Sequence, residues 1–149
     1  MIDRLPVTLA LSALLASATG FPVGRGRKPV DTDPPYYLLY SITATLSGAP
    51  FSDLNEDASF VYQITAVSGP DPDLPESYGV ADQAELLIDR ARKAVLGRAP
   101  GTGLWLHPLT VPGAKVTGRG HDIEPGGTSE PSDAIMNSVL RIRLDLTSA

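Results

Sequence analysis

Two histidines and their neighbouring carboxylates are the residues with the clearest potential for chemistry. The tetrapeptide His121-Asp122-Ile123-Glu124 places three possible metal ligands together, and His107 could join them in a small metal-dependent hydrolase. His107 lies far from His121 in sequence, so the pair lacks the spacing of ligands on one helical turn. Because Gly and Pro surround this tetrapeptide, we expect solvated side chains rather than a metal site.

The remaining carboxylates and hydroxyls do not form a recognisable catalytic pattern. The pairs Asp71/Asp73 and Asp31/Asp33 lie in open Pro-rich segments, where burial would not tune them for acid–base work. Prolines also break the ligand rhythm that a calcium loop would need around Asp71. There is no nucleophile elbow, dinucleotide fingerprint or cysteine. We therefore expect no enzyme activity, cofactor or metal.

A short basic cluster is the other candidate binding feature. Arg25, Arg27 and Lys28 fall in the run Gly-Arg-Gly-Arg-Lys, which lacks the Gly-Lys-Ser/Thr ending of a phosphate-binding P-loop. We expect a solvated or partner-contacting loop here. The whole chain of 149 residues carries a net charge of −5, which argues against nucleic-acid binding as its main role.

A central helix over residues 80–98 is the element around which the chain is organised. Its apolar residues recur at the spacing of one helical face, so it should lie on a sheet. These residues are Val80, Ala84, Leu87, Ile88, Ala91 and Val95. Gly97 is expected to end the helix in the left-handed conformation.

The N-terminal segment favours a second helix over Arg4–Thr19, ended by Gly20. Its inner face would consist of Leu11, Leu14, Leu15 and Ala18. A secretory signal peptide is the alternative, because small residues follow a short apolar run. The leading Met-Ile-Asp-Arg is not net positive, and the apolar run is too short to span a bilayer, so we favour the structural helix.

Alternating segments at residues 36–46, 59–68 and 134–146 predict the strands. The first two should form an antiparallel hairpin, and the last should bury Leu140, Ile142, Leu144 and Leu146. The core face predicted for the first strand is Tyr36, Leu38, Tyr40, Ile42, Ala44 and Leu46. A further short strand is expected at residues 104–109 or 114–117. Residues 20–35, 69–79 and 97–131 are rich in Gly and Pro and predict irregular arms, with residues 118–133 as a protruding loop.

The predicted fold is a single α+β domain over residues 1–149. A mixed or antiparallel sheet of about four strands would be covered by the central amphipathic helix and the N-terminal helix, with long Gly/Pro-rich loops.

The order of these segments resembles the tail terminator proteins of long-tailed bacteriophages. A short helix ends near Gly20 and a Pro-rich arm follows. The strands YYLLYSITATL and SFVYQITAVSG, the helix AELLIDRARKAVLGR, a His- and Gly-bearing segment and the strand VLRIRLDLTSA then come in turn. The resemblance covers almost the whole chain and is one of order and texture, because the family has no catalytic motif to match.

The resemblance implies a structural virion protein, made in the host cytoplasm and located at the head–tail junction. Such proteins form homohexameric rings on the head-proximal end of the tail tube, end its polymerisation and join it to the head connector. The implied partners are other copies of the chain, the tail tube protein and the head–tail stopper or connector protein, with no membrane. DNA would cross the channel without specific binding, which suits an acidic chain.

Interfaces are expected in three loops and on the outer face of the last strand. The candidate interface residues are Arg25, Arg27, Lys28, Phe51, Asp53, Glu56, Asp57, Arg119, His121, Arg141 and Arg143. Another head–tail adaptor or stopper protein, or an exported ligand-binding domain, are the alternative functions.

Overall fold

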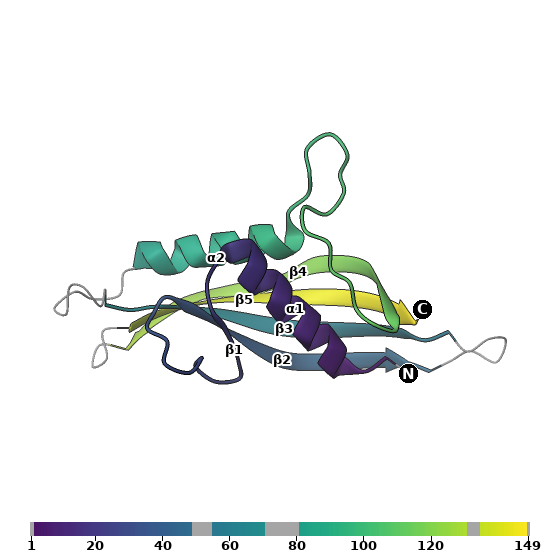
Figure 1. Ribbon diagram of the computed structural model, residues 1–149, viewed down its shortest axis with the longest axis horizontal. Helices are drawn as coiled ribbons and strands as arrows, with labels where there is room; N and C mark the ends of the chain where they lie inside the picture. Colours follow the sequence, from purple (N-terminus) through teal and green to yellow (C-terminus); the bar gives the residue numbers. More distant parts are fainter. Residues whose placement is uncertain (1, 49–54, 71–80, 131–134, 149) are drawn as a thin grey trace.

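The computed structural model describes residues 2–48, 55–70, 81–130 and 135–148, which form two helices and five strands (Figure 1). In chain order the elements are α1 (Arg4–Thr19), β1 (Val23–Arg25), β2 (Tyr36–Ser47), β3 (Asp57–Ser68), α2 (Ala81–Leu96), β4 (Ala114–Glu130) and β5 (Ile135–Ser148). The strands form one sheet, which is not closed, in the order β1-β2-β3-β5-β4. Only the β1–β2 pair is parallel among the described strands. The α+β class is confirmed, with five strands instead of about four.

Both helices pack on the same face of the sheet (Figure 1). The buried Tyr37 hydroxyl of β2 donates a hydrogen bond to the Leu87 carbonyl of α2 at 2.6 Å. On α1, the Thr8 hydroxyl lies 2.9 Å from the hydroxyl of Tyr62 on β3. Alternate residues of β3 and β5 complete this core, including the four leucine and isoleucine residues predicted in the last strand. Burial of these apolar side chains is the main stabilising term of the fold.

The helices begin and end close to the predicted positions. Leu11, Leu14 and Leu15 are buried in the core, and Gly20 ends α1 with a φ of 78°. The conformation predicted for Gly97 is wrong, since the glycines with positive φ in the described chain do not include it. A Cβ atom at Gly97 would lie 2.3 Å from the Lys93 carbonyl oxygen, so close backbone approach requires this glycine.

The core face predicted for β2 is wrong over its first half. Tyr37 and Leu39 are the residues that join the core beneath the helices. The register with β3 shifts between Ser41 and Thr43, and this β-bulge moves the later residues to the opposite phase. Ala44 therefore packs against the core as predicted, whereas Ile42 at the shift and Leu46 near the strand end, both predicted as core residues, are exposed.

Two segments predicted as irregular contain strands. Most of the loop predicted at residues 118–133 belongs to β4, which pairs with β5 over its whole length. Its Gly and Pro residues are tolerated because β4 is an edge strand with three register shifts, one of them spanning Pro125. The arm predicted at residues 21–35 likewise contributes β1.

Some predictions lie outside the described residues. They include most of the crossover at residues 69–79 and the first residue of the predicted central helix, Val80. Of the described helices, neither is long and apolar enough to cross a membrane.

Candidate functional site

The sheet face opposite the helices is half-buried or exposed around the middle of β3 and β5, whereas Tyr36, Thr65 and Val67 at its other end are buried. We call the accessible part, around Val61, Gln63, Arg141 and Arg143, the uncovered face. Strand alternation places Val61 and Gln63 of β3 there, next to Arg143 and Arg141 of β5. The Arg141 Nε donates a hydrogen bond to the Gln63 Oε1 at 3.2 Å, across one register pair. Arg141 and Arg143, predicted as interface residues, therefore share this face, where a neighbouring molecule could contact them.

Two glycines of β4 make room for charged side chains on this uncovered face. Gly118 pairs with Asp145, and Gly120 pairs with Arg143. A Cβ atom at Gly118 would lie 3.2 Å from the Asp145 Oδ2. The Arg143 Nε lies 3.4 Å from that same carboxylate oxygen, so the pair forms a partly exposed ion pair. Such a pair contributes little to stability, and its charges remain available to a partner.

The basic cluster predicted from sequence lies in a groove beside β1. Arg25, Arg27 and Lys28 line it together with Arg4 from the first turn of α1, and its volume is about 680 Å³. Gly24 of β1 also lines the groove and is buried; a Cβ atom there would lie 2.0 Å from the carbonyl oxygen of Arg27, which follows β1. We call these four cations and their surroundings the basic groove. Its charges could bind carboxylates or phosphates.

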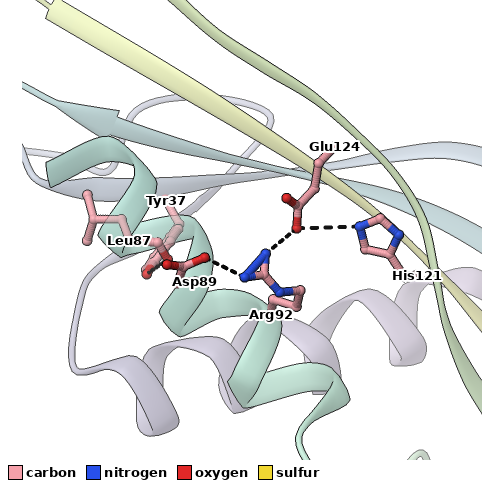
Figure 2. A network of polar contacts seen from close by, with 6 residues as sticks. All are labelled: Tyr37, Leu87, Asp89, Arg92, His121 and Glu124. Atoms are coloured by element: carbon pink, nitrogen blue, oxygen red, sulfur yellow. Dashed lines mark hydrogen bonds and ion pairs between the residues drawn. The ribbon is translucent and has the colours of Figure 1, made fainter. Parts of the chain in front are cut away.

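A polar network connects α2 to β4 on the helix face (Figure 2). The Arg92 guanidinium contacts Asp89 one turn earlier and the Glu124 Oε1 at 2.5 Å. The same Glu124 oxygen lies 3.4 Å from the His121 Nε2. Because the Glu124 carboxylate binds Arg92, it serves to attach the edge strand to the helix.

His121 and Glu124 are the two candidate metal ligands that lie close together, and His107 does not join them. Among the described residues, no group of three His, Asp or Glu side chains could hold a metal ion. His107 lines a separate hollow together with Ala18 and Lys93, whereas His121 belongs to the polar network of Glu124 and Arg92. The geometry therefore gives the hydrolase alternative no support.

The long connection from α2 to β4 is anchored by Trp105, the only tryptophan of the chain. Arg98 and Arg119 place their guanidinium carbons 3.9 and 4.8 Å from the centre of its ring. Arg119 also donates a hydrogen bond to the Val95 carbonyl at 3.0 Å, at the end of α2. Burial, and secondarily the charge of Arg98, lower the pKa of Arg119. Although predicted as an interface residue, Arg119 makes these contacts within its own chain.

The remaining predicted residues lie near one end of the sheet or outside the description. Phe51 and Asp53 are not among the described residues. The Glu56 amide donates to the Ser148 hydroxyl at 2.8 Å, and its carbonyl accepts from the Ser148 amide at 2.8 Å. Asp57 and Asp145 line a shallow hollow of about 580 Å³ at this end.

Sequence reasoning missed three residues of these sites. Arg4 and Arg92 were expected only as parts of the two helices, and Trp105 only as part of a possible strand at residues 104–109. Of the three, only Trp105 could have been found from the sequence, because a single tryptophan beside Gly-rich turns with arginines in the flanking elements suggests stacking.

The chain matches no protein-family model, and no curated protein matches it significantly.

Proposed function

We propose that this protein is a tail terminator of a long-tailed bacteriophage. In this role copies of the chain form a ring on the head-proximal end of the tail tube. The ring ends tube polymerisation and provides the surface that joins the tail to the head connector. The proposal needs no catalytic or cofactor chemistry, and its partners are other copies of the chain, the tail tube protein and the connector.

The observation that carries the proposal is an open sheet with both helices on one face. A ring subunit needs surfaces that its own fold leaves available to its neighbours. The uncovered sheet face supplies one, with half-buried Val61 surrounded by polar and charged side chains. A small apolar centre with a polar rim is the usual composition of a protein–protein interface.

A head–tail adaptor or stopper is the second candidate, because it would use the same kind of subunit surface. An adaptor differs in where it binds: it contacts the connector and does not cap free tail tubes. The exported ligand-binding domain is less well supported, since the helix that would serve as its signal peptide contributes Val7, Leu11 and Leu15 to the core.

Assembly can be tested with one substitution on the uncovered face. We expect the purified protein to form a discrete closed oligomer, and Val61→Glu to dissociate it by placing a charge at the centre of the interface. Leu86→Glu is the matched control, because Leu86 is 52% exposed on α2. Sedimentation velocity gives the subunit number, and circular dichroism verifies that both variants fold. A wild-type protein that stays monomeric at high concentration would contradict the proposal.

A further inference from the structure

The two edges of the sheet are protected to different degrees. β4, at one edge, has three register shifts and carries Lys115, Asp122 and Glu124. Bulges and charges of this kind prevent an edge strand from pairing with other chains. At the other edge, β1 pairs only with residues 37–39 of β2, so residues 40–47 of β2 have no strand beside them in the described chain (Figure 1).

The free part of β2 has one protecting feature, the bulge at Ile42, and none beyond it. Its sequence, YSITATLS, contains no charge and no proline. Beyond the shift at Ile42, residues 43–47 pair regularly with β3, and all of them except Ala44 are exposed. Unpaired N–H and C=O groups along such an edge can bind an extended chain as an added strand.

The basic groove lies at the start of this free edge. Ser41, the second residue of the free segment, lines the groove together with Arg25. β1 leaves the sheet at Gly26, whose N–H bonds to the Leu39 carbonyl at 3.0 Å and whose φ is +72°. A strand of another chain that paired with β2 beyond the end of β1 would therefore begin beside the cations.

The cations of the groove are available to a ligand. Within the described chain, Arg25, Arg27 and Lys28 are exposed and take part in no ion pair. Two apolar side chains on the groove wall, Leu5 and Val30, are 62% and 80% exposed. The groove thus combines unpaired positive charge with apolar contact area.

We propose that the basic groove and the free edge of β2 together bind an extended acidic segment of another polypeptide as an additional β-strand. Carboxylates of the segment pair with Arg25, Arg27 and Lys28, while its backbone pairs with residues 43–47 beyond the bulge. A nucleic acid could use the cations but not the backbone edge, and none of the described residues that line the groove is an aromatic one on which bases could stack. This inference stands whether or not the protein forms a ring.

The probe for the test is a fluorescein-labelled peptide of alternating Thr and Glu, about twelve residues long, titrated in fluorescence polarisation. An added strand pairs through the N–H groups of every second residue. Two further peptides carry N-methyl groups on all Glu or on all Thr residues, which leaves the charge unchanged. We expect one methylated peptide to bind like the parent and the other at least about tenfold more weakly.

The charge requirement is tested on the protein. We expect Arg25→Gln with Arg27→Gln to weaken binding of the parent peptide about tenfold at low salt. Arg141→Gln with Arg143→Gln is the control, because it removes the same charge from the uncovered sheet face and should leave binding unchanged. The proposal is overturned if the parent peptide shows no saturable binding, if both methylated peptides bind like the parent, if the two double variants behave alike, or if a twelve-nucleotide single-stranded DNA binds more tightly.

Discussion

At the residue scale, the contacts of Trp105 with two arginines show how side chains hold an irregular segment in place. The Arg119 guanidinium lies over the Trp105 ring, and its Nε is buried without a hydrogen-bond partner among the described residues. Its bond to the Val95 carbonyl satisfies one of the carbonyls that a helix leaves unpaired at its C-terminal end. One side chain thus links the helix end, the connection and β4.

Replacing Arg119 should expose this dependence. We expect Arg119→Met to lower the free energy of unfolding by about 2 kcal/mol, because it removes the stacking contact and the bond to Val95. The emission of Trp105 should shift to longer wavelength as the ring gains solvent contact. Urea titration followed by fluorescence measures both effects. Arg143→Met, on the uncovered face, should change stability by less than about 0.5 kcal/mol, and equal losses in the two variants would contradict the assignment.

Tyr37 gives a residue-scale prediction that depends on pH. Burial raises the pKa of Tyr37 from 10.0 to about 12, so the folded state holds the phenol proton more tightly than the unfolded chain. The stability from this shift is complete below pH 10 and is lost as the pH rises from 10 towards 12. We expect Tyr37→Phe to cost about 1 kcal/mol at pH 7, through the lost bond to Leu87.

The same variant should be less sensitive to alkali than the wild type. Denaturant midpoints measured at pH 8 and pH 11 would show a smaller drop for Tyr37→Phe, because the titrating phenol is gone. If the denaturant midpoint of the variant dropped as much as that of the wild type, the phenol of Tyr37 would bind its proton no more tightly in the folded state than in the unfolded chain.

At the scale of elements, sequence patterns located the helices, β3 and β5 well, because each has one consistent period. Leu140, Ile142 and Leu144 alternate without interruption and are fully buried. The pattern failed for β2, where a bulge changes the phase within the strand. It also failed for β4, since polar residues and glycines on an edge strand resemble a loop when the pairing with β5 is unknown.

The sites were less predictable than the elements. The sequence indicated the basic cluster and the outward arginines of β5, because these follow from composition and alternation. It could not indicate that Arg4 joins Arg25, or that Glu124 binds Arg92, since those contacts depend on how distant elements pack. The free edge of β2 was equally hidden, because the length of β1 decides it.

Helix α1 should be essential to the core and not an appendage. We expect Leu11→Ala to lower the free energy of unfolding by about 3 kcal/mol, because Leu11 is fully buried and its truncation leaves a cavity. Leu9→Ala is the matched control on the same helix, where Leu9 is 45% exposed and should cost less than about 1 kcal/mol. Thermal denaturation of both variants measures the difference, and a small loss at Leu11 would show that α1 does not belong to the folded core.

At the scale of the whole molecule, the chain combines one closed face with several surfaces available for contact. The helices cover one side of the sheet, while the uncovered face around Val61 and Arg143, the free edge of β2 and the basic groove are accessible in the described structure. Exposed surfaces of this kind are where a protein contacts partners, and they are consistent with the proposed role in assembly.

The most direct test of the proposed function is negative-stain imaging of the purified protein mixed with tail tubes. We predict closed rings with a central pore, and rings at one end of each tube. Tubes assembled in the presence of the protein should also be shorter, because capped ends cannot add subunits. A protein that forms no rings and leaves tube ends and lengths unchanged would contradict the tail terminator role.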